Sequence, residues 1–201
     1  MTIEDVKREY ELALINQMTS EDLSKDDVYV FSMRLCDSKV DSHNECLAVD
    51  ALFDLKKLFV GKTGTIETDD GSKNVTARII SCEIERDNFD YVLTARAFIK
   101  KNDKTIDIIH TIDSGTDINV GVGFAVANCV CSICGNAMAS PLCNHHKGDH
   151  YCIDNTFELC YGKIVSATDA YEFNIKLPKP KKYKAKVRRV KRKKDAGQKE
   201  I

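Results

Sequence analysis

The sequence lacks a long apolar run, a secretory signal and an internal repeat. No apolar stretch approaches the roughly 18 residues that a membrane-spanning helix needs. The first residues, MTIEDVKREYE, are too highly charged for a secretory signal peptide. We therefore expect a soluble chain that is made in a cytosol and has no membrane partner.

Cysteine, in contrast, is abundant, with nine in a chain of 201 residues. Because a cytosol keeps thiols reduced, we expect free cysteines and metal ligands in preference to disulfides. A chain of this length can bury a substantial core, and it fits one domain with an appendage.

The formal net charge of −1 hides a strong asymmetry. Residues 179–201 carry 12 Lys or Arg and 2 acids, a net charge of +10, and the other 178 residues carry −11. We expect an N-terminal helix at 1–19, an acidic domain at 20–178 and a basic tail at 179–201.

Two short motifs predict a metal site. Cys131 and Cys134 form a CxxC motif, and after eight residues Cys143 and His145 form CxH. Two such pairs supply a tetrahedral Zn²⁺ shell with bond lengths of about 2.3 Å to sulfur and 2.0 Å to nitrogen. Because four protein ligands leave no open position, we expect a structural zinc in a loop at about 129–160.

The ligand set is open at this point. His146 could replace His145, and other donors lie close in the sequence, namely Cys129, His150, Cys152 and Cys160. Buried free cysteines are the alternative to a metal site. A catalytic zinc would need a water-bearing position and a nearby general base, which we do not identify.

Hydrophobic periodicity predicts helices at 2–17, 49–59 and 105–112. Thr2 and Asp5 form a capping-box pattern at the start of the first helix. Its apolar stripe, Ile3, Val6, Tyr10 and Leu14, is expected to pack within the protein.

Alternating and β-rich patterns predict the strands. They lie at 28–36, 75–85, 91–100, 118–126 and 171–177, with a hairpin turn at 86–89. Polar loops are expected at 37–45 and 61–74.

The GKTG run at 61–64 lacks the leading glycine of a phosphate-binding loop, since Lys56 stands at that position. Strands interleaved with short helices indicate an α+β domain around a small curved sheet or barrel.

Eight segments in order carry a resemblance to a known family: DDVYVFSMRLCDSKVD, LKKLFVGKTG, ARIISCEIE, TARAFI, DINVGVGFAV, CSICG, CNHHKG and TDAYEFNIKLP. Together they resemble the prohead (capsid maturation) proteases of tailed bacteriophages, above all those of Firmicutes phages with a zinc-knuckle-like insertion. The resemblance covers about residues 20–178. It implies an assemblin-like fold, a small β-barrel with flanking helices, and descent from serine proteases that process scaffold and capsid subunits.

The resemblance also assigns two catalytic positions, and both are substituted here. The family histidine, in a pattern resembling FDHS, falls on Thr68, and the family serine, in a pattern resembling (E/D)VSVG, falls on Asn119. No histidine lies between Val60 and Arg78. Threonine is no general base near neutral pH and an asparagine amide is no useful nucleophile. Loss of either partner typically costs about 10⁴ to 10⁶ in rate, so the resemblance implies a degenerate, inactive member.

The remaining side chains offer only weak candidates for replacement catalytic groups. His110 and Ser114 are four residues apart, but a surface turn and a helix end explain them as well. His43 lies in a polar loop, and no histidine is tied by sequence to Cys82 or Cys129.

The basic tail is the candidate for partner binding. Its charge density at low hydrophobicity predicts that it does not fold by itself. Such a segment would bind DNA in a salt-dependent manner, or an acidic protein surface. The candidate residues are Lys181, Lys182, Lys184, Lys186, Arg188, Arg189, Lys191, Arg192, Lys193 and Lys194.

Together these features predict a non-catalytic virion protein that decorates or reinforces the capsid and is assembled in the host cytoplasm. The expected partners are the major capsid protein, packaged DNA through the tail, and further copies of this chain. The alternatives are an active maturation serine protease with relocated catalytic groups, a transient assembly or scaffolding factor, and a zinc-bearing nucleic-acid binder.

Overall fold

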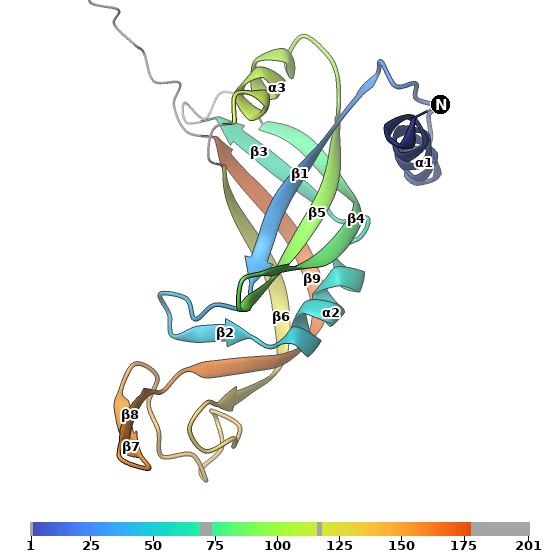
Figure 1. Cartoon of the computed structure of the whole chain (residues 1–201). Helices are drawn as coiled ribbons and strands as arrows, with labels where there is room; N and C mark the ends of the chain where they lie inside the picture. Colours follow the sequence, from blue (N-terminus) through green and yellow to red (C-terminus); the bar gives the residue numbers. More distant parts are fainter. Residues whose placement is uncertain (1, 69–73, 116–117, 178–201) are drawn as a thin grey trace, which may run out of the picture.

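The structure is a computed structural model that describes residues 2–68, 74–115 and 118–177. It has a mixed α+β architecture, in which three helices lie around a largely β core (Figure 1). The helices are α1 (Ile3–Met18), α2 (Val49–Leu58) and α3 (Ile106–Asp113). No helix in the described ranges is long and apolar enough to cross a membrane. The basic tail lies outside the described residues, so the predictions about it remain predictions.

Seven strands form one curved sheet in the order β1, β5, β4, β3, β9, β2, and β6 pairs with the other edge of β9. Their bounds are β1 Val28–Asp37, β2 Glu45–Leu47, β3 Thr63–Thr68, β4 Asn74–Asp87, β5 Asp90–Lys100, β6 Asn119–Cys131 and β9 Gly162–Leu177. A separate hairpin consists of β7 (His150–Ile153) and β8 (Thr156–Leu159).

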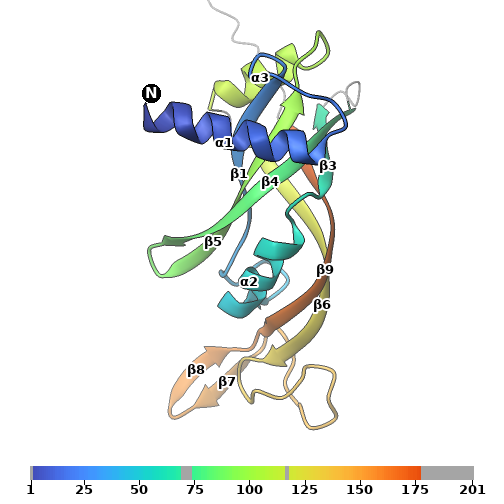
Figure 2. The ribbon, with the colours of Figure 1, turned by 90° about the vertical axis from the view of Figure 1, so that its right-hand side faces the viewer.

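The sheet is open, so the expected barrel is wrong and the curved sheet is right. Among the described strands, only β5 pairs with β1 and only β9 pairs with β6. Register shifts between Gly123 and Cys129 bend the ribbon of β6 and β9, as bulges do. The lower half of this ribbon extends below the sheet and carries the loop that precedes β7 (Figures 1 and 2).

Strand β9 organises the fold. It pairs with β6 along nearly its whole length, and on its other edge with β2 at one end and β3 at the other, both in parallel. Helix α2 connects β2 to β3 across the gap between them. There the Asp54 carboxylate accepts a hydrogen bond from the Ala167 N–H at 3.2 Å, so a side chain takes the place of a ladder partner.

Helix α2 confirms the helix predicted at 49–59, and the hairpin of β4 and β5 confirms the turn predicted at 86–89. Leu52, Leu55 and Phe59 are fully buried against the sheet. Strands β4 and β5 meet at a tight turn in which Asn88 adopts a positive φ of 57°. Asparagine tolerates this left-handed conformation, which two-residue hairpin turns require.

The polar loop expected at 61–74 is wrong over its first half, because Thr63–Thr68 form strand β3, while residues 69–73 lie outside the described residues. Ile66 is fully buried, and Gly64 lies opposite Phe173 of β9. A Cβ atom on Gly64 would come within 2.3 Å of the Phe173 carbonyl oxygen, so the close approach of the two backbones requires glycine here. The loop expected at 37–45 also ends in a strand, since β2 begins at Glu45. Strands β6 and β9 are longer than predicted.

Helix α1 begins as predicted but packs through a different face. The Thr2 hydroxyl accepts a hydrogen bond from the Asp5 N–H at 3.1 Å, and the capping box is complete. The buried residues, however, are Glu11 and Ile15. Three residues of the predicted packing stripe are exposed instead, with Ile3 91%, Val6 52% and Tyr10 64% exposed, and its fourth residue, Leu14, is half-buried.

Candidate metal centre

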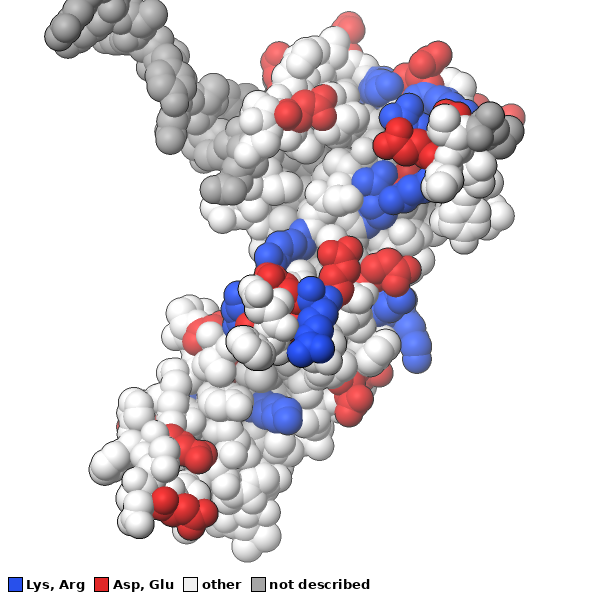
Figure 3. Space-filling view, viewed as in Figure 1, with Lys and Arg blue, Asp and Glu red and all other residues white. Residues whose placement is uncertain are grey.

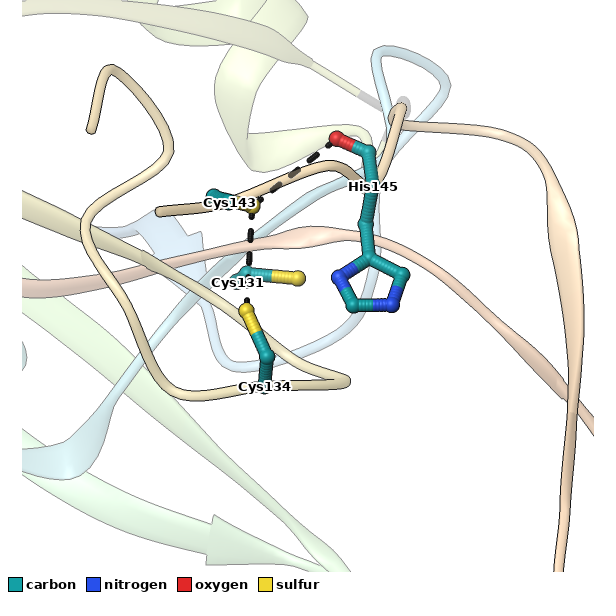
Figure 4. A group of neighbouring side chains, drawn as sticks. All are labelled: Cys131, Cys134, Cys143 and His145. Atoms are coloured by element: carbon teal, nitrogen blue, oxygen red, sulfur yellow. Dashed lines mark hydrogen bonds between the residues drawn. The ribbon is translucent and has the colours of Figure 1, made fainter. Parts of the chain in front are cut away.

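Four side chains converge where β6 ends: Cys131, Cys134, Cys143 and His145 (Figure 4). Their potential ligand atoms all lie within 4.8 Å of one another. The sulfurs of Cys134 and Cys143 are 3.7 Å apart. Sulfur atoms on a tetrahedral zinc at 2.3 Å are separated by about 3.8 Å. The group is therefore compatible with a bound metal ion.

A tight turn after β6 forms the first pair of donors. Cys131 is held by its pairing with Gly162 of β9, and its N–H donates to the Asn136 carbonyl at 2.8 Å. The Gly135 N–H donates back to the Cys131 carbonyl at 2.9 Å, and Gly135 has a φ of +73°. A left-handed glycine closes this turn without strain and brings Cys134 back beneath Cys131.

The loop that follows this turn positions the second pair of donors, Cys143 and His145. The Cys143 N–H donates to the Ser140 carbonyl at 3.0 Å. Beyond His145, the Gly148 N–H donates to the Cys160 carbonyl at 2.8 Å, which attaches the loop to the start of β9. The Lys147 ammonium lies 2.5 Å from the Glu45 carboxylate at the start of β2. The loop is thus tied to both β9 and β2.

Backbone N–H groups near Cys131 and Cys134 favour the thiolate form of both side chains. Burial acts to raise the pKa of Cys131, but the N–H groups of Cys134 and Ile133, together with the thiols of Cys160 and Cys134, lower the pKa to about 7. The Ile133 nitrogen lies 3.4 Å from this sulfur. The backbone N–H of Asn136 lowers the pKa of Cys134 as well. Since the thiolate is the metal-binding form, this environment suits a ligand pair.

His145 supplies the strongest test of whether the residues fit a metal. Its Nδ1 atom is buried and has no hydrogen-bond partner within the described residues. The edge of the Tyr151 ring packs against the imidazole, with centroids 4.5 Å apart and planes at 85°. An orphaned buried nitrogen is costly, and a coordinated ion would satisfy it.

The other donors near the group do not join it. His146 is exposed, and its backbone N–H donates to the Tyr151 hydroxyl at 3.0 Å. Cys152 and His150 are exposed on β7. Cys160 is fully buried, and its sulfur lies 3.7 Å from that of Cys131, but it is outside the group of four.

The two positions that the family resemblance assigns to catalysis lie at one end of the sheet. Thr68 pairs with Leu177 on one edge of β9, and Asn119 pairs with Lys176 on the other. The alternative Ser114 hydroxyl donates to the Thr111 carbonyl at 2.7 Å, while the exposed His110 contributes its own carbonyl to the Ser114 N–H.

Comparison with known proteins adds no relative. No protein-family model, no curated protein and no solved structure matches the chain. Fold and site together therefore define a mixed α+β protein with an open sheet and a Cys₃His group suited to a metal ion.

Proposed function

We propose that this chain is a non-catalytic, capsid-associated structural protein of a tailed bacteriophage, built on a degenerate prohead-protease domain. The observation that carries the proposal is the placement of Thr68 and Asn119. They pair with consecutive residues of β9, one on each edge, so the two positions that the resemblance assigns to one site are close in the fold. Neither residue type supports serine-histidine chemistry.

The proposal includes a structural zinc. Three sulfurs and one imidazole nitrogen form a soft donor set that zinc prefers, and four protein ligands leave no position for a reactive water. The ion would join the end of β6 to the loop that returns to β9. It would thereby hold the lobe that carries β7 and β8 in a fixed relation to β9. Its role would be to stabilise the fold.

Binding to the shell or to DNA is assigned to residues 179–201. On the face shown in Figure 3, acidic and basic side chains of the described residues are intermixed over the sheet and helices. The lobe around β7 and β8 shows few basic side chains on that face. This part of the surface therefore offers no broad basic area for phosphates. The +10 tail is the segment suited to DNA or to acidic surfaces of the major capsid protein.

The test is a quantitative protein gel with intact-mass analysis of mature, DNA-filled particles of the source phage. We expect the chain uncut, tail included, in a copy number comparable to that of the major capsid protein. An absent or fragmented chain together with a capsid protein trimmed at its amino terminus would show instead an active protease. A chain that is intact in proheads but missing from mature particles would show a transient assembly factor. Either result overturns the proposal.

A further inference from the structure

Cys160 is a fifth donor at the metal centre, and the zinc set proposed above does not use it. Its side chain is fully buried, and that of Cys131 is only 1% exposed. The sulfurs of these two residues lie 3.7 Å apart. The sulfurs of Cys134 and Cys143 have the same separation, and two sulfurs on one tetrahedral zinc ion are about 3.8 Å apart. The spacing of Cys160 and Cys131 therefore suits two ligands of the same ion.

The backbone around Cys160 holds this thiol beside the group. Its N–H donates to the Asp149 carbonyl at 2.8 Å, and its carbonyl accepts from the Gly148 N–H at 2.8 Å. Both partners lie in the loop that follows the second pair of donors. Two residues further on, Gly162 pairs with Cys131 across β6 and β9. Cys160 is thus fixed between the two segments that supply the four donors of the group.

The other sulfurs of the group also lie near this thiol. Burial first, and then the sulfurs of Cys131, Cys143 and Cys134, raise the pKa of Cys160 to about 11. A thiol on which all three sulfurs act electrostatically is close to an ion that the three would bind. His145 and Cys160 are therefore alternative fourth ligands, one through nitrogen and the other through sulfur.

We propose that the centre also binds a soft divalent ion of the Cd²⁺ class, and that Cys160 then replaces His145 as the fourth ligand. Zn²⁺ is borderline-soft and is bound by imidazole as well as by thiolate. Softer ions favour sulfur donors. The identity of the ion would thus select the fourth ligand. The inference rests on the metal centre of the proposed function, but not on the capsid role.

The exchange is a change of ligand without oxidation. The Cys160 thiol releases its proton to solvent and its sulfur binds the ion, while the imidazole of His145 leaves as a neutral base. The donor set changes from three sulfurs and one nitrogen to four sulfurs. His145 is the donor suited to leave, because it is half-buried on a loop, whereas Cys160 is fully buried next to β9.

The test is proton–cadmium correlation NMR of the full wild-type chain, loaded with an NMR-active isotope of cadmium. Scalar coupling through a metal–ligand bond identifies each ligand directly, and no variant has to fold. We expect coupling to the β protons of four cysteines and none to the imidazole protons of His145. The four are Cys131, Cys134, Cys143 and Cys160. Coupling to the His145 ring and to only the first three cysteines overturns the inference.

The affinities of two variants for two ions test the exchange by a second route, with a chromophoric chelator as competitor. His145→Ala should weaken zinc binding at least about tenfold, a loss that even perturbing an outer partner of a ligand can cause, and should leave Cd²⁺ binding unchanged. Cys160→Ser, which nearly keeps the size of the side chain, should weaken Cd²⁺ binding and leave zinc binding unchanged. A His145→Ala variant that loses affinity for both ions equally overturns the inference.

Cys129→Ser is the matched control. Cys129 is half-buried on β6, two residues before Cys131, and lies outside the group of four. This variant should keep the affinity for both ions, and the β protons of Cys129 should show no coupling to cadmium. Coupling to Cys129 in place of Cys160 overturns the inference.

The same measurements separate this inference from the structural zinc of the proposed function. A wild type that binds zinc, and that binds Cd²⁺ through His145, overturns the exchange alone. A wild type that binds neither ion overturns both the exchange and the structural zinc.

Discussion

The Glu11 carboxylate and the Arg96 guanidinium form a bidentate pair that is nearly buried, with side-chain exposures of 8% and 28%. Arg96 also donates to the Ser32 hydroxyl at 2.8 Å, so the guanidinium is held by β1 as well. This pair, together with the burial of Ile15 in a cluster that includes Ile80 and Phe98, attaches α1 to the sheet and fixes which face of the helix meets solvent.

Removal of the arginine should therefore destabilise the protein. We expect Arg96→Met to lower the free energy of unfolding by about 3 kcal/mol, because it leaves the Glu11 charge buried without a partner. Urea unfolding measures the change. The control is Lys25→Ala, which breaks an exposed pair with Glu9 and should cost less than about 1 kcal/mol. Equal losses in the two variants would show that the buried pair has no special role.

The metal centre makes a second prediction. Purified protein should contain about one equivalent of zinc, and Cys143→Ser should lower both metal content and thermal stability, since structural zinc contributes directly to folding. Elemental analysis and thermal unfolding measure the two effects. Cys152→Ser is the control, because Cys152 is exposed on β7 outside the group. A metal-free protein of unchanged stability would contradict the zinc proposal.

Gly64 tests the pairing of β3 with β9. Gly64→Ala should destabilise the protein by about 2 kcal/mol, because the added methyl group would meet the Phe173 carbonyl at 2.3 Å. Gly123→Ala is the control, since the nearest atom to its added methyl group lies at 3.8 Å, an ordinary contact. Denaturant unfolding compares them. Similar midpoints for the two variants would indicate that β3 does not approach β9 this closely.

The start of α1 should depend on pH. Hydrogen bonds from the Thr2 N–H and then the Thr2 hydroxyl lower the pKa of Asp5 below its ordinary value of 3.8. A lowered folded-state pKa means that the carboxylate stabilises the helix start above pH 3.8, and that this support is lost as the pH falls through the folded-state pKa.

Amide exchange at Asp5 and Val6 measures this loss, because their N–H groups bond the Thr2 hydroxyl and the Thr2 carbonyl. Protection should fall as the pH is lowered below 3.8, after correction for intrinsic exchange rates. In Asp5→Asn, protection should be low already at neutral pH and show no such transition. Protection that is equal in both proteins across this range would contradict the role of the capping box.

Local signals predicted the parts of the fold that local chemistry controls. The capping box at Thr2, the stripe of α2 and the turn at Asn88 lie where the sequence places them. Strand β3 escaped prediction because its TGTIET sequence offers one apolar side chain, and its strand conformation depends on pairing with β4 and β9. The full length of β6 and β9 also depends on tertiary pairing, since the two strands are hydrogen-bonded to each other and not to sequence neighbours.

The candidate metal group shows the same division. Spacing alone selected Cys131, Cys134 and Cys143, because short intervals of sequence constrain distance. The choice of His145 over His146 needed the fold, since consecutive residues have the same reach along the chain. The structure buries the Nδ1 atom of His145 beside the sulfurs and leaves His146 exposed.

For helix α1, the sequence predicts which residues share a side, but not which side packs on the sheet. Periodicity determined that Ile3, Val6 and Tyr10 share one side of a helix, because 3.6 residues per turn fix that relation within the segment. The side that packs on the sheet depends on distant residues: Arg96, which is 85 residues away from Glu11, and the cluster of Ile80 and Phe98 in which Ile15 is buried. A helix carries its pattern in its own sequence, but the charge and shape that meet it come from distant segments, and only the tertiary structure brings them together.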